Sequence, residues 1–425
     1  MQIQLPEISD QTMAFLDACE KDCAQVFEAL DVIERKNTRK VLKAFQHHRV
    51  SARHFAQTTG YGYDDIGRDT LSSMFAEVLG AETALVRPQI ASGTHALALC
   101  LFGVLRPGDV LLSAAGKPYD TMEQVIGLGG DAGQGSLKEY GIGYRQVELT
   151  EDGQIDIQSV VDNLDDAVRL VLIQRSRGYD WRSALTTGQI GEAVKAIHAK
   201  SSRALVMVDN CYGEFTDVVE PCDMGADLIA GSLIKNIGGG IAPTGGYIAG
   251  TREAVELVSY RLTSPGIGAE VGSYAAGYQP FYQGLFEAPH VVMQAIKTGV
   301  LAARAFQKLG FAVSPAYDAP RSDIIEAICF GDAEKLIAFV QAIQACSPVD
   351  SEATPEPWEM PGYRDPVIMA AGTFVAGASI ELSADAPIRA PFTAYLQGGL
   401  TYSHGRIGVE GAVQLLLDAG AIALA

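Results

Sequence analysis

The chain has 425 residues, 48 % hydrophobic and 20 % charged, a composition typical of a globular protein that is too long for a single core. Its 32 basic and 51 acidic residues give a net charge of −19 without a basic block, which disfavours nucleic acid and anionic membrane surfaces as partners. Seven cysteines without a paired framework indicate a reducing compartment, and the first residues lack the features of a signal peptide. We therefore expect a cytoplasmic protein with no membrane span.

The N-terminal region is predicted to be helical. Apolar residues recur three or four apart between positions 10 and 48, which indicates one helix or two. Cys19 and Cys23 lie four apart, but no further ligands follow at zinc-site spacing, so we expect buried thiols. His47 and His48 are neighbours, and adjacent helical positions point apart, so we expect a solvated turn and no metal site.

The rest of the chain alternates strand and helix patterns. Apolar runs predict strands at 109–113, 168–173, 204–208 and 227–230, with a helix at 188–200. This order predicts an α/β fold with a mainly parallel sheet covered by helices on both faces. A long helix from about 291 to 309 should lead into a smaller α/β part, with strands at 324–330 and 378–383 and helices at 332–344 and 411–424. We therefore divide the chain into a helical arm (1–57), a large domain (58–290) and a small C-terminal domain (291–425).

An acid and a lysine follow two neighbouring strands of the large domain. Asp209 comes directly after the 204–208 strand, and Lys235 follows the 227–230 strand. A pyridoxal phosphate (PLP) enzyme needs such a pair, because the lysine amine forms a Schiff base with the cofactor and the carboxylate keeps the pyridine nitrogen protonated. To act as a base at neutral pH, Lys235 would need a lowered pKa, which we expect from desolvation and cationic partners.

A short polar turn upstream is a candidate phosphate site. Ser92, Gly93 and Thr94 precede the apolar helix 96–105, so free N–H groups and the positive end of the helix dipole are available there. The alternative is a simple helix N-cap. A nucleotide-binding α/β protein could also use this turn, but it would leave Lys235 unexplained.

Several motifs carry a family resemblance. Val208-Asp209-Asn210 followed by Ser232-Leu-Ile-Lys235 resembles the fold type I PLP-dependent enzymes of cysteine and methionine metabolism, the cystathionine lyase and methionine gamma-lyase group. Within that group, three segments resemble a branch of aluminium resistance or methionine gamma-lyase-like proteins: Gln174–Gly178, Asp209–Phe215 and Gly398–Tyr402. The resemblance implies the PLP-dependent transferase fold, with 58–290 as the PLP-binding domain. It also implies a lyase that acts on an amino acid, with sulfur as the expected leaving group, by β- or γ-elimination through a Lys235 Schiff base.

The resemblance also implies roles for cofactor-binding residues. Tyr119 matches a catalytic tyrosine that stacks on the pyridine ring, although a loop tyrosine covering a helix is the alternative. Ser232 matches a serine that contacts the phosphate, whereas Ile234 replaces the usual threonine. Tyr63 and Arg68 are the nearest match to a tyrosine and an arginine that reach the phosphate of the adjoining subunit, and an ordinary loop is the alternative. These roles predict a homodimer or homotetramer.

Four arginines are candidates for binding the substrate. Arg175 and Arg177 follow the 168–173 strand, where charged residues point into the crevice at the carboxyl ends, so either is a candidate contact to phosphate or to a substrate carboxylate. The resemblance assigns the substrate carboxylate to an arginine of the small domain, either Arg406 or Arg389. A surface arginine is the alternative for both.

A second function remains open at this stage. The protein could bind PLP and have a non-catalytic role in metal tolerance or regulation, as the name of the resembled branch suggests. A hard cation such as aluminium would need several converging carboxylates, and the acidic residues are spread along the chain. Turnover of amino acids by the PLP-bound protein would discriminate between the two functions.

Overall fold

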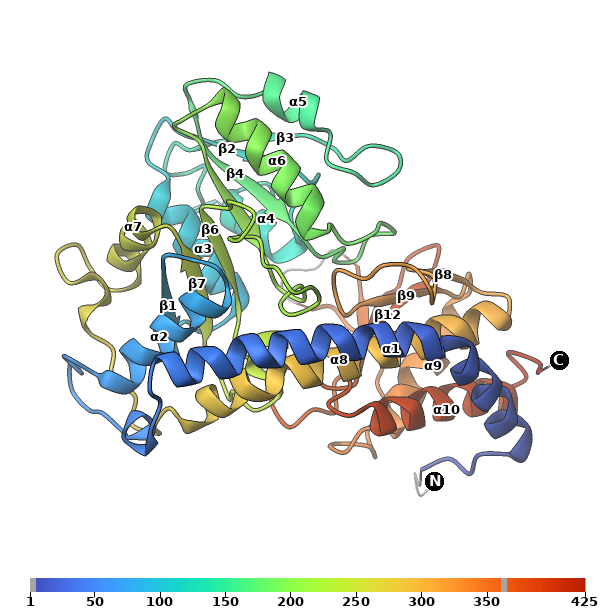
Figure 1. Ribbon diagram of the computed structural model, residues 1–425. Helices are drawn as coiled ribbons and strands as arrows, with labels where there is room; N and C mark the ends of the chain where they lie inside the picture. Colours follow the sequence, from blue (N-terminus) through green and yellow to red (C-terminus); the bar gives the residue numbers. More distant parts are fainter. Residues whose placement is uncertain (1–4, 131, 361–364, 425) are drawn as a thin grey trace.

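Two separate β-sheets organise the protein. The computed structural model describes residues 5–130, 132–360 and 365–424. Figure 1 shows the larger sheet with its helices in the upper part of the view and the smaller sheet at the lower right. One long helix, drawn in blue, runs beneath both.

The larger sheet has seven strands in the order β1-β7-β6-β5-β4-β2-β3. Its strands are β1 (Thr83–Arg87), β2 (Val110–Ser113), β3 (Gly143–Gln146), β4 (Val168–Gln174), β5 (Leu205–Asp209), β6 (Leu228–Ser232) and β7 (Gly246–Gly250). Neighbours from β3 to β6 pair in parallel, whereas β7 runs antiparallel to both β6 and β1. The predicted mainly parallel sheet is confirmed.

Helices cover both faces of this sheet. They are α2 (Ile66–Val78), α3 (Gly93–Val104), α4 (Asp120–Ile126), α5 (Ile157–Asp162), α6 (Thr187–Lys200) and α7 (Arg252–Leu262), with short 3-10 turns at Ala52–Phe55, Asn236–Gly238 and Gly268–Glu270. Side chains alternate along a strand. Val206 and Val208 of β5 therefore join one apolar cluster with Ile190 of α6, while Met207 joins a second cluster with Leu97 of α3.

The smaller sheet has five antiparallel strands in the order β10-β11-β12-β9-β8. Its elements are β8 (Ala312–Ser314), β9 (Glu326–Cys329), β10 (Val367–Ala370), β11 (Ser383–Pro387), β12 (Thr393–Gln397), α9 (Ala333–Ala345) and α10 (Tyr402–Asp418). The strand predicted at 378–383 is wrong, because that segment forms turns and β11 begins only at its end. The Glu381 carboxylate accepts hydrogen bonds from the N–H groups of Phe374 and Val375, which holds the segment in this turn.

Two long helices connect the parts of the chain. The N-terminal region forms one continuous helix, α1 (Asp10–His47), in which Cys19 and Cys23 are fully buried as expected. It packs along α8 (Gln279–Lys308), which begins well before the expected position 291, so the boundary at 290 falls inside a helix (Figure 1). No helix in the part of the chain that the structure describes is both long enough and apolar enough to cross a bilayer.

The end of α1 differs from the prediction. The helix ends at His47, and His48 is its C-cap. His47 Nδ1 lies 2.7 Å and His48 Nε2 lies 3.0 Å from the same atom, Oε2 of Glu77 on α2. The expectation that the two rings point apart is therefore wrong, because the regular helical spacing stops between them.

Candidate active site

A cavity of about 310 Å³ lies between the two sheets. The larger sheet contributes the carboxyl ends of β4, β5 and β6, and the smaller sheet contributes residues of β10, β11 and β12. Seven predicted residues line this cavity: Ser92, Gly93, Thr94, Tyr119, Asp209, Ser232 and Lys235. The fold thus gathers the predicted acid, lysine and phosphate-binding turn around one space.

Asp209 ends β5 in the middle of the larger sheet. It pairs in register with Gln174 of β4 and with Ala230 of β6, so the sheet fixes its backbone on both sides. Its carboxylate Oδ1 accepts a hydrogen bond of 3.1 Å from the N–H of Cys211. Burial raises the pKa of Asp209, while the positive charge of Lys235 opposes that rise.

Lys235 reaches the cavity from a tight turn after β6. Gly239, at the end of this turn, has a φ of +57°, and a Cβ there would lie 2.5 Å from the carbonyl oxygen of Gly284 on α8. Only glycine allows both this conformation and this approach. The turn is therefore pressed against α8, which holds the backbone of Lys235 in place.

The electrostatic surroundings of Lys235 differ from the expectation. Its Nζ lies 4.0 Å from the ring centroid of Tyr212. Burial alone would lower the pKa of Lys235, but Cys211, Tyr212 and Asp209 raise it, and the net direction is upward. The prediction that the pKa of Lys235 is lowered is therefore wrong for the protein without its cofactor. The lysine faces acidic groups and not the expected cationic partners.

The predicted phosphate-binding turn forms the start of α3. The Ser92 hydroxyl caps the helix by accepting a hydrogen bond from the N–H of His95, and the Thr94 hydroxyl lies 3.0 Å from that of Thr121. A Cβ on Gly93 would lie 3.3 Å from Cys211 Sγ and 3.5 Å from Ser232 Cβ. The helix end, with its free N–H groups, therefore sits directly against the end of β6.

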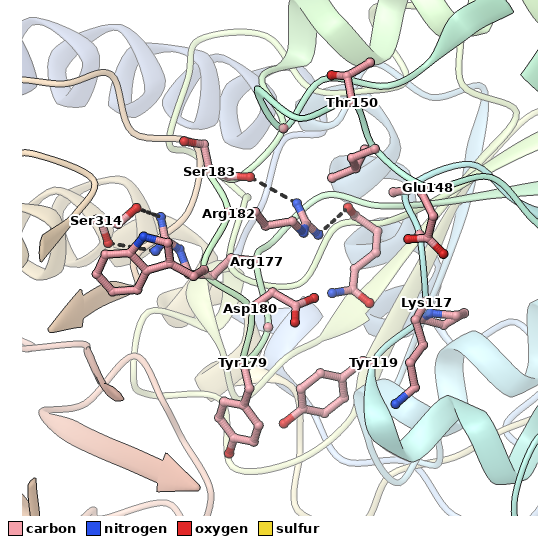
Figure 2. Close-up of a pocket in the computed structure, with 18 of the residues that line it drawn as sticks. Lys117, Tyr119, Glu148, Thr150, Arg177, Tyr179, Asp180, Arg182, Ser183 and Ser314 are labelled. Carbon is pink, nitrogen blue, oxygen red and sulfur yellow. Dashed lines mark hydrogen bonds between the residues drawn. The ribbon is translucent and has the colours of Figure 1, made fainter. Parts of the chain in front are cut away.

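Tyr119 separates this cavity from a larger polar cavity of about 690 Å³ (Figure 2). Its ring lies beside that of Tyr179, with centroids 5.8 Å apart. Figure 2 shows the two rings together at one end of the polar cavity, with Lys117 nearby and Arg182 farther in. Tyr119, Gln174 and Gly178 line both cavities, so the two spaces adjoin.

The four candidate arginines do not line the cavity beside Lys235. Arg175 is buried and bonded to Asn210 and Thr216, and Arg177 donates to the carbonyl oxygen of Ser314 (Figure 2).

The arginines of the small domain are also engaged elsewhere. Arg389 pairs with Asp365 and lines the polar cavity. Arg406, on α10, pairs with three carboxylates, those of Asp17, Glu20 and Glu410. The structure thus places Arg177 and Arg389 near the site and leaves Arg175 and Arg406 apart from it.

Tyr63 lies in the segment before α2 and Arg68 in the first turn of α2, and neither lines this cavity. The Tyr63 ring is 63 % exposed. Arg68 is 2 % exposed and donates to the Asp69 carboxylate and to the carbonyl oxygen of Gly62. Their predicted role concerns a neighbouring subunit, so it stays a prediction.

The structure adds acidic and aromatic residues that the sequence did not indicate. Asp385 of β11 lines the cavity, and its Oδ2 accepts hydrogen bonds from Gln397 Nε2 (2.8 Å) and from the Tyr179 hydroxyl (3.3 Å). Burial raises the pKa of Asp385 to about 6. Behind the cavity, burial raises the pKa of Glu214 to about 8, and the Tyr247 hydroxyl donates to its Oε1.

Two of the residues that the structure adds, Tyr212 and Glu214, had a sequence signal, because both lie inside the Asp209–Phe215 motif. Tyr212 also has a φ of 70°, an unusual backbone conformation for a tyrosine. Asp385 belongs to a segment whose strand was placed too early, so its direction could not be predicted.

Comparison with known proteins identifies the family. The Methionine gamma-lyase family matches residues 12–417. The uncharacterised protein YnbB of Bacillus subtilis is 52 % identical over 399 residues, which cover 94 % of this chain and 95 % of that protein. A solved carbon-sulfur lyase involved in aluminum resistance from Clostridium novyi NT is 51 % identical, with a TM-score of 0.92 and 96 % of both chains covered. The pyridoxal-5'-phosphate dependent protein YhfS from Escherichia coli shares the fold, with a TM-score of 0.59 and 15 % identity over 92 % of this chain and 97 % of that one. The chain therefore belongs to the methionine gamma-lyase family.

Proposed function

We propose that the protein is a PLP-dependent carbon–sulfur lyase that acts on a sulfur-containing amino acid by β- or γ-elimination. The observation that carries the proposal is the convergence of Lys235, Asp209 and the N-terminus of α3 on one cavity. Membership of the methionine gamma-lyase family supports the same reaction class.

The residues of the cavity fit the cofactor. The hydroxyls of Ser92, Thr94 and Ser232 and the free N–H groups at the start of α3 suit a phosphate group. The lack of a side chain on Gly93 keeps this corner open, since a Cβ there would meet Cys211 and approach Ser232. When bound, pyridoxal phosphate supplies an aldehyde for amines and an electron sink for charge that develops at the substrate Cα.

The protein groups then have distinct tasks. Lys235 is the amine that would hold the cofactor, and it would carry the proton taken from Cα. Asp209 would keep the pyridine nitrogen protonated, and Tyr119 would cover the ring. Because the acidic neighbours of Lys235 raise its pKa, proton removal depends on the cofactor offsetting their charge. The sulfur group leaves with a proton, and hydrolysis gives a 2-oxo acid and ammonia.

The proposal includes a homodimer or homotetramer. The exposed ring of Tyr63 is available to a neighbouring subunit, whereas Arg68 is already bonded within its own chain. Tyr63 is therefore the better candidate for a contribution across the interface. For contact with the substrate carboxylate, Arg177 and Arg389 are the better candidates of the four arginines, because both line the adjoining cavity.

The test is the visible absorption spectrum of the protein reconstituted with PLP, followed by product assays with cystathionine and methionine. We expect a cofactor band in the natural protein and in Lys195→Ala, an exposed-lysine control. Lys235→Ala should lose the band, and only the natural protein and the control should release thiol, 2-oxo acid and ammonia. A stable band without turnover of either amino acid would favour the non-catalytic PLP-binding role. Absence of the band would overturn both.

A further inference from the structure

Three metal-ligating side chains converge where α1 ends against α2. His47, His48 and Glu77 each offer one ligand atom, and these atoms all lie within 4.8 Å of one another. We propose that these residues form a binding site for a borderline divalent cation of the Zn²⁺ class.

The geometry is close to that of a bound ion. His47 Nδ1 and His48 Nε2 lie 2.7 and 3.0 Å from Glu77 Oε2. In a tetrahedral zinc site with bonds of about 2.0 Å, ligand atoms are roughly 3.3 Å apart. Small side-chain rotations would therefore bring the three atoms into position without moving either helix.

The donor types select the metal. Two imidazole nitrogens and one carboxylate oxygen suit Zn²⁺, Ni²⁺ or Cu²⁺, whereas Mg²⁺ and other hard cations prefer oxygen ligands alone. The His47 side chain is 73 % exposed and that of Glu77 36 %, so an ion can enter and keep water in its remaining position. Aluminium is a hard cation that prefers oxygen ligands, so the two nitrogen donors of this site do not suit it.

The convergence of two rings distinguishes this site from an ordinary ion pair. His290 Nδ1 lies 2.9 Å from Glu34 Oε1 at the contact between α8 and α1, with only one histidine and one carboxylate. That pair has two ligands and serves as a matched control. None of the three proposed ligands lines the cavity beside Lys235, so the metal site does not depend on the proposed lyase activity.

A bound ion would join two elements of the fold. It would tie the C-terminal end of the long helix α1 to the C-terminal half of α2. The segment between these helices carries Tyr63, the residue that we propose for a subunit contact. Metal binding should therefore raise the thermal unfolding temperature, because it stabilises only the folded arrangement.

Calorimetric titration of the full-length, PLP-loaded protein with ZnCl₂ tests the proposal. We expect about one equivalent to bind to the natural protein and to His290→Asn. Affinity should fall by more than about tenfold in His48→Asn and in Glu77→Gln, since even changes to residues behind a ligand cost about 10- to 100-fold. Zinc should also raise the unfolding temperature of the natural protein and of His290→Asn, but not that of His48→Asn or Glu77→Gln.

A Co²⁺ titration followed by visible spectroscopy provides a second readout, because ligation by nitrogen changes the spectrum of the ion. MgCl₂ should give neither heat nor a shift in unfolding temperature. Equal zinc affinity in all four proteins would place the ion elsewhere, for example at a cysteine, and would overturn the proposal. No zinc binding to the natural protein would overturn it as well.

Discussion

The two sheets each contribute one half-buried acid to the cavity around Lys235, but they hold it differently. Asp209 stands at the carboxyl end of a parallel strand, between two neighbouring strands, and accepts a hydrogen bond from the backbone N–H of Cys211. Asp385 lies within an antiparallel strand, and its Oδ2 is held by the side chains of Gln397 and Tyr179. Burial raises the pKa of both acids.

The difference suggests a division of labour. The larger sheet fixes Asp209 through the backbone, which suits a group that must meet a cofactor in one position. The side-chain contacts of Asp385 occupy one carboxylate oxygen, and among the described residues no hydrogen bond reaches its Oδ1. Asp385 therefore has an oxygen available for a donor on the substrate.

The largest effect is expected at Asp209. Asp209→Asn keeps the shape of the side chain but removes the charge that would hold a proton on the pyridine nitrogen. We expect turnover to fall by about 100- to 1000-fold, the cost of losing one preorganised electrostatic contact. Steady-state kinetics with the best substrate measures this loss.

The cofactor content of the Asp209 variant must be compared at the same time. We expect the variant still to bind PLP, because Lys235 and the turn at Ser92 are unchanged. An equal loss of turnover with an empty cavity would indicate a folding or binding defect and would contradict the electrostatic role.

A smaller effect is expected at Asp385. Asp385→Asn should reduce kcat/KM by about tenfold, since a hydrogen bond to a charged group is worth roughly 1.5 kcal/mol or more. With a folded pKa of about 6, the natural protein should gain activity as the pH rises through 6, and the variant should lose that limb of the profile.

Asp318→Asn is the matched control for this experiment. Asp318 also belongs to the C-terminal part of the chain, but it is exposed and lines neither cavity. We expect it to leave the limb near pH 6 in place. If both variants kept that limb, Asp385 would not be the group that titrates.

Glu214 is a third acid near Lys235, and unlike Asp209 and Asp385 it is fully buried. It therefore tests the effect of burial on a carboxyl pKa. Glu214 has a folded pKa of about 8, against 4.5 ordinarily, and its Oε2 has no hydrogen-bond partner among the residues that the structure describes. Between these two pH values the folded state keeps a proton that the unfolded state has lost. The free energy of unfolding should therefore fall as the pH rises from about 4.5 to about 8, by at most roughly 1.4 kcal/mol per pH unit.

Glu214→Gln should abolish this contribution, because a neutral amide takes the place of the acid. Chemical denaturation at several pH values measures the slope, and Glu192→Gln on the surface of α6 serves as the control. A slope that is the same in the natural protein and both variants would mean that another group titrates in this range.

The same comparison explains what the sequence could and could not predict. Asp209 and Lys235 were predictable because parallel strands bring their carboxyl ends to one edge of a sheet, so position along the chain determines position in space. Asp385 was not predictable, because an antiparallel strand places its side chains according to register, and the turn at Glu381 shifts the start of β11.

The partners of the arginines could not be predicted for a related reason. The position of Arg175 and Arg177 after β4 was correct, but a guanidinium group can turn toward any nearby acceptor. Buried acceptors such as Asn210 and the Ser314 carbonyl are already in place for them. Partner choice of long side chains is set by tertiary contacts that a local motif does not contain.

The smallest effect is expected at Arg406, and it separates a structural role from a substrate role. Two of its three carboxylate partners, Asp17 and Glu20, lie on α1, so these ion pairs join α10 to α1, and the side chain is 23 % exposed. Arg406→Gln should therefore lower the free energy of unfolding by no more than about 1 kcal/mol, since partly exposed ion pairs contribute little. It should leave KM unchanged, because the residue does not line the cavity beside Lys235. Thermal unfolding measures the change in stability, and steady-state kinetics on the same preparation measures KM. A large rise in KM would contradict the structural role and indicate that Arg406 contacts the substrate carboxylate.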